Sequence, residues 1–82
     1  MTDLDKAKAA FLEKVDQYLY FKNAEQTEQL LSAAKAVRGI MDHVPDNRLY
    51  DVSKAAELPR WAEVTFDHAA ERIMAALEKR KV

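Results

Sequence analysis

Arg38 and His43 are the residues of this sequence whose types and spacing could act on a phosphodiester. A histidine can give or take a proton near neutral pH, and an arginine can hold a phosphate through two parallel hydrogen bonds. On an unbroken helix, however, their separation turns the two side chains about 140° apart. A purely structural explanation is a solvated helix face on which His43 lies near the negative end of the helix dipole.

The segment from Arg38 to His43 resembles the arginine-x4-histidine pattern of a large family of small all-α dimeric ribonucleases. In that family the histidine and the arginine act on the scissile phosphate. The resemblance covers this short segment only. It implies, as an alternative function, a ribonuclease dimer that uses Arg38 and His43 as its catalytic residues.

Other kinds of chemistry find less support. Glu63, Asp67 and Glu71 recur at helical spacing beside His68, but neither histidine follows a glutamate at the spacing that carboxylate-bridged metal sites use. A carboxylate row of this kind is typical of a solvated helix face. The chain has no cysteine, which removes thiolate ligands and nucleophiles. We therefore expect no metal site, no cofactor and no enzymatic activity.

Composition limits the partners. The 82 residues carry 13 basic and 14 acidic side chains, for a net charge of −1, and the basic ones are scattered rather than gathered in a stripe. This gives no electrostatic reason to expect a nucleic acid. No apolar run approaches the length of a membrane span, and the N-terminus lacks the apolar core of a signal peptide. We expect a soluble, cytoplasmic protein.

A first helix is predicted to begin at Thr2, which can cap it together with Asp5, and to end at a tight turn formed by Lys22 and Asn23. Apolar side chains at spacings of three and four give this helix one buried face, made by Leu4, Ala7, Phe11, Val15 and Tyr18. Tyr20 projects to the opposite side.

The stretch 24–44 is predicted to be the central helix of the bundle. Its apolar seam is formed by Thr27, Leu30, Ala34, Val37, Met41 and Val44. Gly39 would then lie inside the helix on its outer side, where a glycine usually indicates close approach of another backbone. Pro45 ends this helix.

Asp46 or Asn47 can cap a short fourth helix at about 47–57, and Pro59 can begin the last helix, which runs to about Arg80. The core face of the last helix is formed by Phe66, Ala69, Ala70, Ile73 and Leu77. The predicted fold is all-α: a single domain spanning 1–82 and built as a small three-helix bundle with this short fourth helix.

A second apolar line runs along the back of the last helix. Trp61, Val64 and His68 form it, Arg72 flanks it, and Tyr20 adds an exposed aromatic ring on the first helix. Two explanations stay open: the line binds a partner protein or a second copy of the chain, or residues 45–58 fold back and cover Trp61. Tryptophan is enriched at interface hot spots, which favours the partner surface.

These observations predict a non-enzymatic protein-interaction or regulatory module, such as an adaptor or an inhibitor. A chain this short buries little more than about 60% of the surface that its unfolded form exposes, so a homodimer that uses helix faces would add needed stability. A further alternative is an oligomer that holds a small anionic ligand between subunits with tyrosines and arginines.

Overall fold

The computed structural model describes residues 2–59 and 64–80. Within these ranges the chain forms α1 (Asp3–Phe21), α2 (Ala24–Val37), a 3-10 helix η1 (Asp46–Arg48), α3 (Leu49–Ala55) and α4 (Phe66–Arg80). The predicted all-α bundle is confirmed, and the short fourth helix is α3 with η1 as its first turn. None of these helices is both long and apolar enough to cross a membrane.

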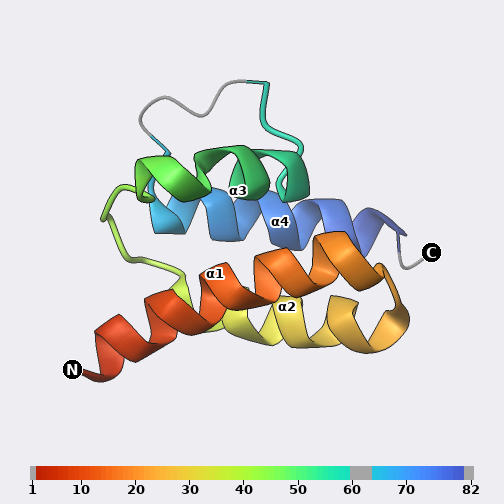
Figure 1. Cartoon of the computed structure of the whole chain (residues 1–82), viewed down its shortest axis with the longest axis horizontal. Coiled ribbons are helices and arrows are strands. Elements are labelled where there is room, and N and C mark those ends of the chain that lie inside the picture. Colours follow the sequence, from red (N-terminus) through yellow and green to blue (C-terminus); the bar gives the residue numbers. More distant parts are fainter. Residues whose placement is uncertain (1, 60–63, 81–82) are drawn as a thin grey trace.

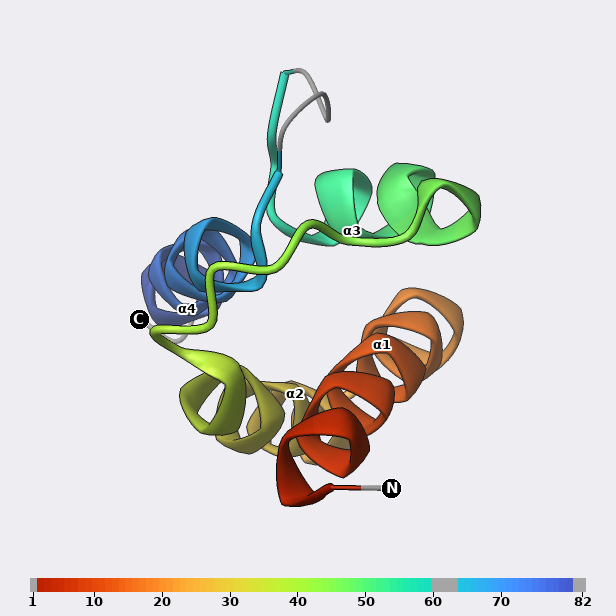
Figure 2. The same ribbon diagram turned by 90° about the vertical axis from the view of Figure 1, so that its left-hand side faces the viewer.

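The helices form two layers. α1 and α2 make an antiparallel hairpin, and α3 and α4 lie over it (Figure 1). Viewed from the side, the four helices surround one centre (Figure 2). α1 packs on α2 and α3, and α4 packs on the same two helices from the other side.

The hairpin forms where the capping residues were predicted. The Thr2 hydroxyl accepts a hydrogen bond from the Asp5 amide at 3.2 Å, and the Asn23 side chain accepts one from the Gln26 amide at 2.9 Å. Lys22 ends α1 in the left-handed conformation with a φ of 52°. These local hydrogen bonds satisfy amides that helix ends leave without partners, so neighbouring residues determine where α1 and α2 begin.

The core lies between the two layers. It receives Phe11, Val15 and Tyr18 from α1, Leu30, Leu31, Ala34 and Val37 from α2, Val52 and Ala55 from α3, and Phe66, Ala69, Ala70, Ile73 and Leu77 from α4. The rings of Phe11 and Phe66 meet edge to face, with centroids 5.9 Å apart. The predicted faces are therefore confirmed for α4 and for most of α1. Leu4 is the exception, because it lies in the first turn of α1 and is 47% exposed.

The predicted central helix is wrong beyond Val37. Arg38 turns to an extended conformation, and residues 40–44 run alongside residues 64–67. The Val44 amide donates to the Val64 carbonyl at 3.1 Å. As a result Met41 is 69% exposed instead of filling the seam, and Val44 is buried from an extended segment rather than from a helix.

Gly39 lies in the turn two residues after the end of α2 instead of inside the helix. Its φ of 92° is a conformation that side chains rarely adopt, and its amide donates to the Asp67 carboxylate at 2.7 Å. The expected close approach of another backbone is wrong, because a Cβ at this position would meet no described atom within 4 Å. The conformation of the backbone, rather than space, is therefore what favours glycine here.

Replacing Gly39 by alanine is expected to lower the free energy of unfolding by about 1–2 kcal/mol, because a Cβ disfavours this φ. Urea unfolding followed by circular dichroism measures the change. Gly39→Asn is the matched control and should lose less, because asparagine tolerates positive φ better. Equal stability of Gly39→Ala and the unmodified protein would contradict this explanation.

The last helix begins at Phe66, later than the predicted start at Pro59. Val64 and Thr65 are not helical, and Thr65 forms an isolated bridge with His43. Proline's preference for the first turn of a helix suggested the earlier start. The actual start is determined by hydrogen bonds to a distant segment, which the local sequence does not encode.

Candidate functional site

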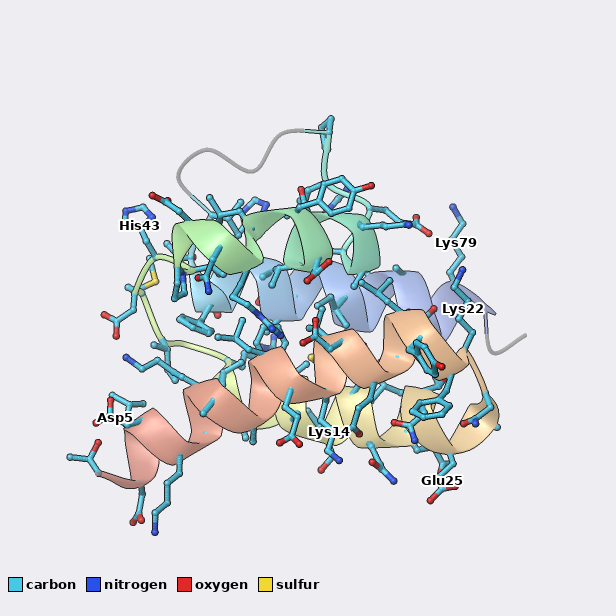
Figure 3. All side chains as sticks on the ribbon, viewed as in Figure 1. Asp5, Lys14, Lys22, Glu25, His43 and Lys79 are labelled. Carbon is cyan, nitrogen blue, oxygen red and sulfur yellow. The ribbon has the colours of Figure 1, made fainter. Side chains whose placement is uncertain are left out.

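The structure places the two candidate catalytic residues in different surroundings. Arg38 follows the end of α2, and its guanidinium lies 3.3 Å from a carboxylate oxygen of Glu71 on α4. Arg38 and Glu71 line a surface hollow, to which Glu78 also contributes. His43 lies in the extended segment and points outward at the edge of the molecule (Figure 3). Its Nδ1 is 3.3 Å from the Val64 carbonyl oxygen. Arg38 is thus paired with the Glu71 carboxylate, which a phosphate would have to displace.

The N-terminus of α4 has no free amide to offer an anion. The first two amides, of Phe66 and Asp67, donate to carbonyls within 40–42 at 2.9 and 2.8 Å. The next two, of His68 and Ala69, donate to the Thr65 hydroxyl and carbonyl at 3.1 and 2.9 Å. Anions bind helix N-termini through unpaired amides, and these four are paired.

The predicted surface on the back of the last helix is wrong in its geometry. Val64 precedes α4 and is only 5% exposed, so it shares no helix face with His68. His68 and Arg72 lie on α4 and are exposed, as expected. Trp61 lies outside the described residues, so its predicted role in partner binding, like the alternative that residues 45–58 cover it, stays a prediction.

Tyr20, in contrast, is 82% exposed, and the adjacent Phe21 is 55% exposed. Their rings contact each other edge to face, with centroids 4.8 Å apart. The exposure follows from the helix: Tyr18 points into the core, and a shift of two positions turns a side chain to roughly the opposite side. Two large aromatic side chains therefore stand in water at the end of α1.

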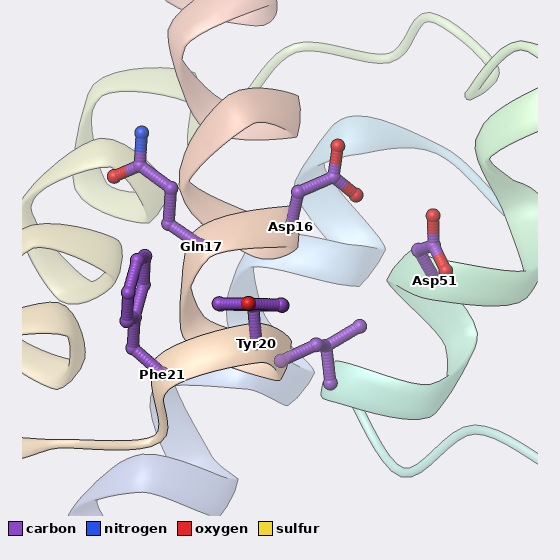
Figure 4. A pocket seen from close by; sticks show the side chains of 6 residues that line it. Asp16, Gln17, Tyr20, Phe21 and Asp51 are labelled. Carbon is purple, nitrogen blue, oxygen red and sulfur yellow. The ribbon is translucent and has the colours of Figure 1, made fainter.

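A shallow hollow of about 520 Å³ adjoins these rings, between α1 and α3 (Figure 4). It is lined by Asp16, Gln17, Leu19, Tyr20, Phe21 and Asp51. We call this surface, with its hollow, the aromatic edge. In Figure 4 Tyr20 lies between Phe21 on one side and Asp51 on the other. Asp51 comes from α3, so two helices must pack correctly to form the surface.

Arg48 holds those two helices together. Its guanidinium donates to the Asp16 carboxylate at 2.5 Å and to the Leu12 carbonyl. Its Nε is buried without a hydrogen-bond partner among the described residues. Nothing in the sequence distinguishes Arg48, because a single arginine in a turn forms no repeated spacing or motif with its neighbours. Its role depends on the packing of α1 next to it, which supplies both of its hydrogen-bond acceptors.

Lys8 makes a similar connection further along α1. Its ammonium group donates to the Asp42 carboxylate at 2.6 Å and lies 5.8 Å from the centre of the Phe66 ring. The hydrogen bond to Asp42 raises the pKa of Lys8 above its ordinary value of 10.5. Lys8 therefore links α1 to the segment between α2 and η1 and plays no part in the aromatic edge.

Within residues 2–59 and 64–80, no three histidine, aspartate or glutamate side chains gather closely enough to hold a metal ion. Comparison of the sequence with protein families and with curated proteins, and of the structure with solved structures, found no match. The geometry of the chain itself is therefore the basis for a functional proposal.

Proposed function

We propose that this chain is a non-enzymatic protein-interaction module, an adaptor or an inhibitor, and that it binds its partner through the aromatic edge. The observation that supports this is the exposure of Tyr20 and Phe21 beside a hollow. Exposed aromatic rings forfeit about 25 cal/mol for each Å² of apolar area left in water, which a partner could recover. Tyrosine is also enriched among the residues that dominate binding energy.

The other exposed apolar side chains support this choice of surface. Leu4 is at the opposite end of α1, and Met41 lies in the extended segment after α2. Tyr50 is exposed on α3, and the Lys54 ammonium lies 5.9 Å from the centre of its ring. Single exposed apolar residues are normal on protein surfaces. The aromatic edge differs because two rings contact each other beside a concave surface. A cytoplasmic location is part of the same proposal.

The two alternatives from the sequence gain no comparable support. A ribonuclease would need Arg38 free to hold a phosphate, but its guanidinium is paired with Glu71. A site for a small anion would need converging donors, whereas the aromatic edge is lined by the carboxylates of Asp16 and Asp51.

Photo-crosslinking can test the proposal in cells of the native host. A benzophenone amino acid at position 20 should capture a partner that the same group at position 4 does not capture. Mass spectrometry then identifies the captured protein. Capture counts as support only when the identified protein also binds the purified chain.

With that purified partner, Tyr20→Ala should weaken binding tenfold or more. Leu4→Ala, which removes another exposed apolar side chain from the same helix, should leave the affinity unchanged. Both variants should keep the unfolding free energy within about 0.5 kcal/mol of the unmodified protein, because both side chains are exposed. Equal affinities of the two variants would refute the proposal.

A further inference from the structure

We infer that the chain has a second interaction surface, the outer edge of the extended segment 40–44, and that it binds an extended peptide segment of a partner protein. The peptide is held by main-chain hydrogen bonds, as a strand is held in a sheet. This surface is separate from the aromatic edge and goes beyond the proposed function. We call it the open edge.

Alternate residues of the segment direct their main-chain groups toward residues 64–67. The Ile40 and Asp42 carbonyls accept hydrogen bonds from the first two amides of α4 at 2.8 and 2.9 Å. The Val44 amide donates to a carbonyl of the same stretch at 3.1 Å. The antiparallel bridge made by His43 lies between the last two contacts. One side of the segment is therefore paired in the manner of a β-strand.

The intervening residues direct their main-chain groups the other way. Successive N–H and C=O groups of an extended chain point to opposite sides, so those of Met41 and His43 point away from residues 64–67. Neither residue has a main-chain hydrogen-bond partner among residues 2–59 and 64–80. Two amides and two carbonyls thus lie along the open edge at the spacing that an added strand requires.

The segment lies at the surface of the molecule. It passes along the left-hand end of the structure between α2 and η1 (Figure 1), and in the view onto that end no helix crosses in front of it (Figure 2). Met41 is 69% exposed, and His43 is exposed as well. A strand that is paired on one side and open on the other is a template for a further strand.

The chemistry of the open edge determines what kind of partner fits. A helix cannot pair with these groups, because its own amides and carbonyls already bond to each other. An extended peptide offers free main-chain groups at the right spacing, and an apolar side chain on it can pack against the exposed thioether of Met41. Pro45 has no N–H, and Gly39 donates its amide to Asp67, so the paired part of the peptide is short.

A phage-displayed library of random linear peptides is the probe that tests the open edge. Peptides selected on the unmodified protein should bind His43→Pro at least tenfold more weakly than His43→Ala. Both variants lose the imidazole, but only proline lacks the N–H that the peptide needs. Lys22→Ala changes an exposed side chain at the opposite end of the molecule (Figure 3) and should bind like the unmodified protein.

Hydrogen exchange of the unmodified protein gives a second measurement, which holds even if proline unfolds the chain. A saturating concentration of a selected peptide should slow exchange of the Met41 and His43 amides at least tenfold. The Val44 amide is already paired and should change less. Circular dichroism establishes whether each variant is folded.

Several results would overturn the inference. Peptides that bind a folded His43→Pro as well as His43→Ala would do so, as would Met41 and His43 amides that exchange at the same rate with and without peptide. Peptides weakened only by Tyr20→Ala would bind the aromatic edge instead. A dimer of the unmodified chain that His43→Pro converts to a monomer in sedimentation would make a second copy, rather than a partner protein, the occupant.

Discussion

Replacing Phe11 by alanine is expected to lower the free energy of unfolding by about 3–5 kcal/mol, the usual cost of truncating a buried aromatic side chain. Phe11 is fully buried, and its ring contacts the Phe66 ring across the two layers. A domain of this size has a total stability of about 4–12 kcal/mol, so the variant would lose a large fraction of it. Urea unfolding followed by circular dichroism measures the loss.

Two variants serve as controls for Phe11→Ala. Leu4→Ala removes an apolar side chain from the same helix at an exposed position and should cost much less. Phe11→Leu keeps the site filled but removes the ring contact, so its loss should lie between the two. A loss for Phe11→Ala no greater than that for Leu4→Ala would show that the two layers do not pack as described.

Replacing Arg48 by methionine is expected to cost about 2 kcal/mol. The variant loses hydrogen bonds to the Asp16 carboxylate and the Leu12 carbonyl, and charged hydrogen bonds contribute about 1.5–3 kcal/mol each. The expected loss is smaller than the sum of the two contributions because Asp16 is partly exposed and water screens the ion pair. Methionine retains an apolar stem of similar length, so the change tests the charged contacts rather than the packing.

Arg38→Met is the matched control for Arg48→Met. Arg38 also forms an ion pair, with Glu71, but the two side chains are 59% and 54% exposed. Such surface pairs contribute about 0–1 kcal/mol, so this variant should remain close to the unmodified protein in urea unfolding. Equal losses for the two arginine variants would mean that Arg48 does not fasten α3 to α1.

The sequence predicted the parts of the fold that depend on neighbouring residues. The capped ends of the α1–α2 hairpin and the buried face of α4 follow from interactions a few positions apart. The end of α2 could not be predicted in this way, because Val37, Met41 and Val44 continue the helical spacing past the point where the helix stops. Backbone hydrogen bonds between residues 40–44 and 64–67 follow that end, and backbone groups carry little information about residue type.

In the candidate site, too, only the features that depend on neighbouring residues could be predicted from the sequence. The outward direction of Tyr20 could be predicted from the periodicity of one helix. The hollow could not, because Asp16 and Asp51 are brought together by the packing of α1 on α3. The predicted surface on the back of the last helix fails for a related reason. It placed Val64 on that helix, but Val64 instead accepts a hydrogen bond from the distant Val44 amide and precedes α4.

The hydrogen bonds at the start of α4 affect how the chain reaches this structure. The first two amides of α4 donate hydrogen bonds to the carbonyls of Asp42 and Ile40, and the Gly39 amide donates one to the Asp67 carboxylate. The α1–α2 hairpin can form from local contacts, but the first turn of α4 is complete only after the segment following α2 has docked against it. We therefore expect the hairpin to form before the first turn of α4 is completed, and separation of the two layers to expose backbone groups as well as the core.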